Sequence, residues 1–171
     1  MFYSCTNLKY LTLPNQMRSL RDASDMFRSC SSLKYIDLGF LENNSNIKNL
    51  EGMFINCNNL MEIEFPNVYT KPYLNLRYMF SGCINIKSIN LGKIKGKQIG
   101  SMTQMFFNCE KLEFIDISGL NLTDVGGNEK FKIFEGVGKN TTKNITIKYD
   151  KDNIDEDIEI QIEELINKTS L

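Results

Sequence analysis

The stretch "MFRSCSSLKYIDL", residues 26–38, decides the fold because it recurs along the chain. Met-Phe pairs begin at residues 1, 26, 53, 79 and 105, so successive copies are 25, 27, 26 and 26 residues apart by subtraction. A cysteine follows each Met by four residues, and a leucine or isoleucine follows the cysteine by three. Each copy ends in two apolar residues separated by one, which gives M-F-x-x-C-x-x-[LI]-x-x-[LI]-x-[LFI]. A fixed period of this kind is typical of proteins built from stacked repeats.

Each copy predicts one short strand and one short helical segment. The alternation at its end places both apolar residues on one face of a strand. Upstream of Met-Phe, apolar residues lie three apart, which predicts about two turns of helix or 3₁₀-like coil with one buried stripe. That stripe comprises Leu20, Ala23 and Met26, then Ile47, Leu50 and Met53, then Tyr73, Leu76 and Met79, then Ile99, Met102 and Met105. Since one unit cannot cover its own apolar face, we expect an α/β repeat solenoid with a short parallel sheet on one side and the helical segments opposite.

A degenerate sixth copy begins near residue 133. Ile133-Phe134 takes the Met-Phe position, and Val137 takes the cysteine position. Its strand, Ile145 and Ile147, is displaced by about two residues, and terminal repeats are often atypical in this way. Residues 1–149 are therefore expected to form one domain of about six repeats, starting near residues 1, 26, 53, 79, 105 and 133.

The segment 150–171 differs in charge from the rest of the chain. It carries eight acidic and two basic residues, a net charge of −6 by subtraction. Ile154, Ile158, Ile162 and Leu165 lie three to four residues apart, as on one face of a helix that covers the last repeat. The alternation in "IEIQI" also fits a strand. "DKDNIDED" lacks the glycine that a calcium-binding EF-hand loop needs at its sixth position.

The five cysteines occupy one position of the repeat. Because Val137 fills that position in the sixth copy, we interpret it as a small buried apolar site. A disulfide between neighbouring copies stays open as an alternative, since adjacent strands lie within the permitted Cα range. A metal site or a catalytic thiol is disfavoured because one cysteine per repeat forms a row and the chain has no histidine.

Composition excludes several other classes of function. Without histidine there is no Ser-His-Asp triad or Cys-His pair, so we expect no enzyme, no cofactor and no metal site. The formal net charge of −1 gives no basic footprint for nucleic acid. No apolar run reaches the ~18 residues of a membrane span, and the first residues do not resemble a signal peptide.

"MFRSCSSLKYIDL" and "MFSGCINIKSINL" resemble the BspA-like, or Treponema-type, leucine-rich repeats of bacterial and parasite surface proteins. The resemblance covers about residues 1–149 and implies a right-handed leucine-rich-repeat solenoid. It further implies a cell-surface or secreted location and the binding of host proteins or other cells, without catalytic residues. The chain opens in mid-repeat without an N-terminal cap or secretion signal, so we expect it to be a fragment of a longer protein.

In such a solenoid the outward strand residues form a continuous face. We expect a protein partner, from a host or a cell surface, to bind there, because exposed aromatic side chains beside charges are typical of interfaces. The alternative is that these positions are merely polar and that tyrosine favours strands. A second reading of the whole chain is an intracellular scaffold or receptor segment. The predicted partner-binding residues are Tyr10, Thr12, Tyr35, Asp37, Glu62, Glu64, Asn90, Phe114 and Asp116.

Overall fold

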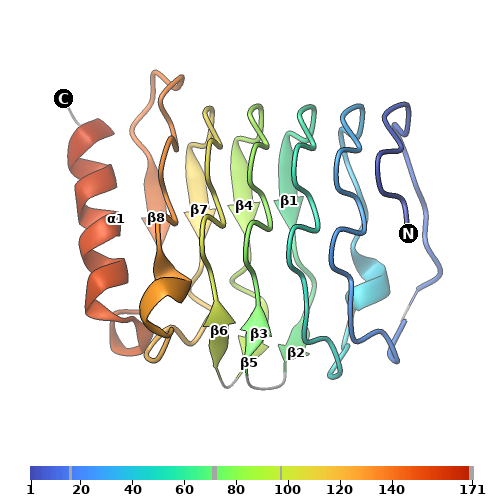
Figure 1. Cartoon of the computed structure of the whole chain (residues 1–171), viewed down its shortest axis with the longest axis horizontal. Helices are drawn as coiled ribbons and strands as arrows, with labels where there is room; N and C mark the ends of the chain where they lie inside the picture. The colour runs from blue at the N-terminus through green and yellow to red at the C-terminus, as the bar shows by residue number, and fades with distance from the viewer. Residues whose placement is uncertain (16, 71–72, 97, 170–171) are drawn as a thin grey trace.

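The computed structural model describes residues 1–15, 17–70, 73–96 and 98–169, and in this part of the chain the repeats lie side by side in a row (Figure 1). The N-terminus lies at one end of the row and helix α1 (Glu156–Thr169) at the other. Equivalent positions of neighbouring repeats are adjacent in space, because the strands that pair belong to successive repeats. The repeat period of the sequence thus sets which side chains touch.

The described strands are all parallel and form three small sheets. The largest runs across the face of the row in the order β1 (Glu62–Glu64), β4 (Ser88–Asn90), β7 (Phe114–Asp116) and β8 (Thr146–Lys148). Two further pairs join β2 (Val68–Thr70) to β5 (Ile94–Gly96), and β3 (Leu74–Asn75) to β6 (Ile99–Ser101). In the main sheet the apolar residues of the repeat align, with Ile63 opposite Ile89 and Ile89 opposite Ile115.

The main sheet begins later in the chain than the repeat pattern predicts. Strand positions 10–12 and 35–37 lie outside the paired sheet. Between the second and third repeats the strand side is joined by a bond from Met61 N to Lys34 O, stretched to 3.4 Å. The corresponding bond from Lys87 N to Met61 O is 2.7 Å, so pairing tightens toward the middle of the row.

The segments before each Met-Phe pair form no regular helix in the described residues. They form single turns with 3₁₀-type bonds, as from Met26 N to Ala23 O at 3.2 Å and from Met53 N to Leu50 O at 3.3 Å. Asp22, Asn49 and Asn75 pair instead as parallel bridges, so the chain is extended where a helix was expected. Tyr73, assigned to the buried stripe, is 68% exposed, and Leu74 is buried in its place. The three-residue spacing arises because a short extended stretch runs directly into tight turns.

The Met-Phe pair and the cysteine belong to consecutive β-turns. The cysteine N–H donates to the Phe carbonyl of its own repeat, as Cys57 does to Phe54 at 3.1 Å. The residue before each cysteine, and before Val137 in the sixth repeat, has positive φ and is serine, asparagine or glycine: Ser4, Ser29, Asn56, Gly82, Asn108 and Gly136. These residue types tolerate the left-handed conformation better than most. A turn of this kind leaves alternate N–H groups free to bond to the next repeat.

The core is a continuous column of apolar side chains. Six phenylalanine rings stack face to face along it, at centroid distances of 5.5–6.0 Å, from Phe2 through Phe27, Phe54, Phe80 and Phe106 to Phe134. The four internal rings are fully buried. Burying a side chain of this size contributes roughly 1.5–3 kcal/mol of hydrophobic stabilisation, so the column is a principal source of stability.

The C-terminal segment folds as a helix rather than as a strand. Three short 3₁₀ helices occur earlier, at Gly39–Leu41, Gly127–Lys130 and Lys151–Asn153. Helix α1 buries Ile158, Ile162 and Leu165 against the last repeat. Lys130, whose side chain is 15% exposed, pairs with Asp155 and Asp157 at 2.7 and 2.6 Å and so fixes the start of α1.

Candidate functional site

The strand face carries a shallow groove of about 490 Å³ over β1, β4 and the extended residues before them. It brings together most of the residues predicted to bind a partner: Tyr35, Asp37, Glu62, Glu64, Asn90 and Phe114. Alternation along each strand turns these side chains outward, while Ile36, Ile63 and Ile89 point into the core. The same pattern that builds the core therefore builds the groove.

The groove lies between two aromatic residues, and a small side chain makes it concave. Along one column of the sheet, Glu62 lies opposite Ser88, and Ser88 lies opposite Phe114. Serine is small, so it leaves a depression between its larger neighbours. Tyr35, 58% exposed, borders the groove on the far side of Glu62. Tyr35 and Phe114 are three repeats apart, which corresponds to about 14 Å at the usual strand spacing.

The groove is acidic. Asp37, Glu42, Glu62 and Glu64 line it together with a single cation, Lys93. Lys93 Nζ lies 2.7 Å from Glu64 Oε1, and this hydrogen bond raises the pKa of Lys93 above its ordinary value. The side chain of Glu62 makes no hydrogen bond or ion pair with any residue that the structure describes, although its backbone pairs with Ser88 in the sheet. The central carboxylate of the groove is thus available to an incoming cation.

Some of the acidic row serves the fold. Asp37 Oδ1 accepts the N–H of Gly39 at 2.8 Å, and Asn90 Oδ1 accepts that of Gly92 at 3.0 Å. These Asx turns end each strand, which is a local structural role. Glutamate at position 64 is too long for such a turn and pairs with Lys93 instead. Glu62 and Glu64 are therefore more plainly surface groups than Asp37.

Asp116, predicted to bind a partner on the strand face, is only 6% exposed, so little of it is accessible there. Its Oδ1 accepts bonds from the N–H and hydroxyl of Ser118, and its Oδ2 lies 3.2 Å from Lys148 Nζ. Burial acts to raise the pKa of Asp116, but the bonds from Ser118 and Lys148 together hold it below its ordinary value. Asp116 is a satisfied structural carboxylate.

Two other predicted residues lie apart from the groove. Tyr10 is 73% exposed, and Thr12 is exposed beside it, but neither lines the groove. Both belong to the first repeat, whose strand position is outside the paired sheet. They extend the strand face toward the N-terminal end without contributing to the concave site.

The last strand has a different register from the one expected. Thr146 lies opposite Phe114, and Lys148 lies opposite Asp116, whereas the pattern placed Asn144 and Thr146 there. Ile145, assigned to the core side of the strand, is buried against Gly138 before the strand begins. The longer turn region of the sixth repeat causes this shift of two residues. The acidic row consequently ends at a lysine.

The sequence pattern missed Glu42, Asn67 and Lys93, which form the rim of the groove. Asn67 Nδ2 donates to Glu42 Oε1 at 3.2 Å, across two repeats. These residues follow the strands, in linkers whose lengths differ between repeats, so no fixed spacing marks them. The polar side chains of these three residues were the one available signal.

The cysteine position is buried in four of the five copies, as Cys30, Cys57, Cys83 and Cys109, while Cys5 at the open end is exposed. The described thiols form no disulfide. Each buried thiol lies 3.0–3.2 Å from the Phe carbonyl of the preceding repeat, for example Cys83 Sγ from Phe54 O. Burial raises the pKa of the Cys57, Cys83 and Cys109 thiols, so they stay protonated and donate. The thiols are core groups that also bond between repeats.

Two further observations concern the described residues only. No three histidine, cysteine, aspartate or glutamate side chains there are grouped closely enough to hold a metal ion. None of the helices there combines the length and apolar composition required to cross a bilayer.

Comparison with known proteins gives one match. A family model described as "Mycoplasma protein of unknown function, DUF285" matches residues 21–147, which include the second to sixth repeats. No curated protein and no solved structure is similar enough to count as a match. The chain therefore belongs to the DUF285 family.

Proposed function

We propose that this chain is a non-catalytic protein-binding module whose strand face holds a basic segment of another protein. One observation carries the proposal: Glu62, without a partner among the described residues, stands in a groove between Tyr35 and Phe114. A carboxylate between two aromatic side chains attracts a lysine or arginine both by charge and by cation–π contact. Arginine and aromatic residues are the usual anchors of protein interfaces.

The surroundings of Glu62 favour a cation over other ligands. The lining carries four carboxylates against one ammonium group, so its field repels phosphate-rich ligands such as nucleic acid. The groove is shallow and open, which suits a side chain presented on a protein surface better than an enclosed small molecule. Exposed aromatic rings supply apolar contact area at little entropic cost.

The wider classification belongs to the same proposal. Repetition of the Met-Phe-x-x-Cys unit, parallel pairing of successive strands and the stacked rings support a leucine-rich-repeat solenoid of the BspA-like type. An adhesion module of a cell-surface or secreted protein follows from that resemblance. The second candidate, an intracellular scaffold or receptor segment, uses the same groove. Immunofluorescence on intact and permeabilised cells separates the two, since a surface module is labelled without permeabilisation.

Binding of a labelled basic peptide tests the proposal. A fluorescein-labelled dodecapeptide rich in lysine and arginine is titrated with the chain, and its fluorescence anisotropy is followed. Glu62→Lys should weaken binding roughly tenfold, because the charge at the centre of the groove is reversed. Glu163→Lys, an equal change of charge on an exposed position of α1 at the far end, is the matched control. Equal affinities for the two variants, or no binding by the unmodified chain, contradict the proposal.

A further inference from the structure

Each internal repeat uses the same backbone N–H groups to bond to the repeat after it. The N–H of the Phe in Met-Phe donates to the following Met carbonyl: Phe27 to Met53, Phe54 to Met79 and Phe80 to Met105, each at 2.9 Å. Two residues further on, Gly82 N donates to Phe107 O and Asn108 N to Glu135 O, both at 2.8 Å. Two residues earlier, Tyr78 N donates to Thr103 O at 3.0 Å. The bonding edge of a repeat therefore includes these three alternate N–H groups, and a fourth lies two residues earlier, as Leu76 N, which donates to Ser101 O at 2.9 Å.

The last repeat presents this edge without a following repeat. Its equivalent donors are the N–H groups of Lys132, Phe134 and Gly136, and none of them bonds to any residue that the structure describes. Helix α1 lies beside the last repeat at the end of the row (Figure 1). There Gln161 accepts the N–H of Ile133 at 3.3 Å and donates to Lys130 O at 3.1 Å. The N–H groups of Lys132, Phe134 and Gly136 stay unbonded to any described residue although α1 lies beside them.

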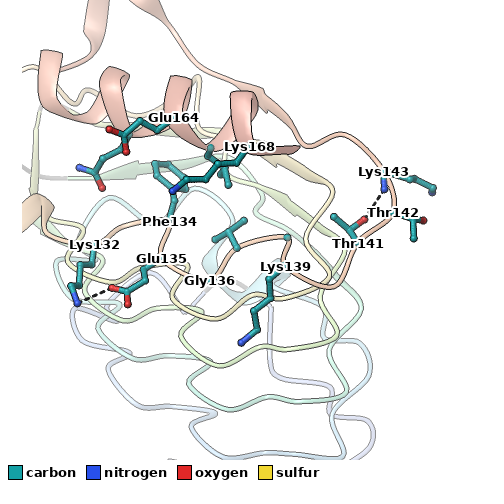
Figure 2. A pocket seen from close by; sticks show the side chains of 14 residues that line it. Lys132, Phe134, Glu135, Gly136, Lys139, Thr141, Thr142, Lys143, Glu164 and Lys168 are labelled. Atoms are coloured by element: carbon teal, nitrogen blue, oxygen red, sulfur yellow. Dashed lines mark hydrogen bonds and ion pairs between the residues drawn. The ribbon is translucent and has the colours of Figure 1, made fainter. Parts of the chain in front are cut away.

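A pocket of about 670 Å³ lies over this edge, between the last repeat and the end of α1. Figure 2 shows the turn that carries Lys132, Phe134 and Gly136 on one side, with Glu164 and Lys168 on the other. Phe134, the last ring of the stacked column, lies at its base. In the internal repeats the equivalent donors bond to carbonyl groups on alternate residues of the next repeat, as Phe80 N does to Met105 O and Gly82 N to Phe107 O.

The side chains around the pocket add positive charge. Lys132, Lys139, Lys143 and Lys168 line it, against Glu135 and Glu164. The first three pair with Glu135, Glu110 and Glu113. These ion pairs are exposed at the lysine and worth little, so the lysines are available to a ligand. Lys168 makes no ion pair with a described residue.

We propose that this pocket binds an acidic segment of a polypeptide, which pairs its backbone carbonyls with the N–H groups of Lys132, Phe134 and Gly136 and its carboxylates with Lys168 and the neighbouring lysines. The segment takes the place that a further repeat holds elsewhere in the row. This mode repeats the main-chain bonding between neighbouring repeats, so main-chain bonds give affinity and side chains give selectivity. The site is separate from the strand-face groove and selects the opposite charge.

A labelled acidic peptide tests this site on the whole chain. The probe is a fluorescein-labelled octapeptide of alternating glutamate and valine, followed by fluorescence anisotropy at about 0.15 M salt, where the Debye length is about 8 Å. Lys168→Glu and Thr142→Glu should each weaken binding roughly tenfold, while Lys95→Glu, on exposed β5, should leave it unchanged. Two pocket variants are used because Lys168→Glu alters α1, whereas Thr142→Glu lies outside that helix.

A backbone analogue separates peptide pairing from simple anion binding. Replacing alternate amides of the octapeptide by esters weakens its carbonyl acceptors and retains its charge, so binding should fall at least fivefold or so. An analogue that binds as tightly as the amide peptide, or is displaced equally well by inositol hexaphosphate, reveals an anion site and overturns the proposal. Equal binding by Lys168→Glu and Lys95→Glu, or no binding at all, also overturns it. Tyr35→Ala should not change this affinity, which keeps the result independent of the groove.

Discussion

The turns that carry the Met-Phe pairs, here called the Met-Phe edge, and the strand face differ in how much their side chains vary from repeat to repeat. Along the Met-Phe edge the same groups recur in every repeat: a stacked ring, a positive-φ residue and, in the internal copies, a buried thiol near the preceding Phe carbonyl. On the strand face each repeat presents a different side chain, so Tyr35, Glu62, Ser88 and Phe114 follow one another along a single column. Positions that repeat stabilise the stack, whereas positions that vary give one part of the face its own shape and charge.

The largest expected effect lies on the repeating side. Phe54 is fully buried between Phe27 and Phe80, at centroid distances of 5.5 and 5.7 Å. Phe54→Ala should lower the free energy of unfolding by about 3–5 kcal/mol, since it leaves a cavity in the middle of the column. Urea unfolding followed by circular dichroism measures the change. A loss below about 1 kcal/mol would mean that the rings do not act as one core.

A smaller effect is expected at the cysteine position. Cys83 Sγ lies 3.0 Å from Phe54 O, so a serine hydroxyl there has an acceptor within reach. We expect Cys83→Ala and Cys83→Ser each to cost about 1–2 kcal/mol in urea unfolding, with serine no worse than alanine. If serine is the more destabilising by about 2 kcal/mol, the thiol functions as an apolar group and its bond to Phe54 contributes nothing.

Asp116 should show a modest effect that depends on pH. Its pKa is below the ordinary value, so its carboxylate contributes stability above the unfolded-state pKa, about 3.9, and this contribution disappears as pH falls through the lower folded-state pKa. Asp116→Asn keeps an acceptor for Ser118 but removes the charge facing Lys148. The variant should lose about 1 kcal/mol at pH 7 and close to nothing at pH 2–3, as measured by urea unfolding. An equal loss at both values would contradict the charge-based role.

The smallest effect on stability is expected in the groove. Tyr35 is exposed and lies outside the paired sheet, so Tyr35→Ala should change the free energy of unfolding by less than about 0.5 kcal/mol. The same substitution should weaken the basic dodecapeptide several-fold, because one aromatic wall is lost. If Tyr35→Ala loses stability and keeps its affinity for the peptide, Tyr35 stabilises the fold and does not serve binding, which contradicts the proposed role of the strand face.

The sequence predicted the repeats and the buried strand residues because their spacing is fixed by contacts between equivalent positions. It did not predict the turns, because apolar residues three apart fit a helix and an extended-turn segment equally well. The run of serine, asparagine and glycine before each cysteine, as at Ser29, Asn56 and Gly82, was the signal for left-handed turns. The burial of Asp116 was not predicted because it depends on Lys148, whose register is shifted by the longer sixth turn.

Only part of the groove was predicted from the sequence. Alternation identified Glu62, Glu64 and Phe114 as outward residues, since it depends only on strand geometry. The hollow at Ser88 depends on the sizes of neighbouring side chains in different repeats, and pairing of the carboxylates depends on linkers of unequal length. Such contacts between repeats follow from the three-dimensional stack and not from the period.

Nuclear magnetic resonance mapping tests the strand-face claim most directly. The isotope-labelled chain is titrated with the basic dodecapeptide, and amide chemical shifts are followed across the described residues. Shifts should concentrate between Tyr35 and Phe114, with the largest changes next to Glu62, and should be small at Phe54 and along α1. Shifts spread evenly over the acidic surface, or centred on α1, would contradict a specific groove.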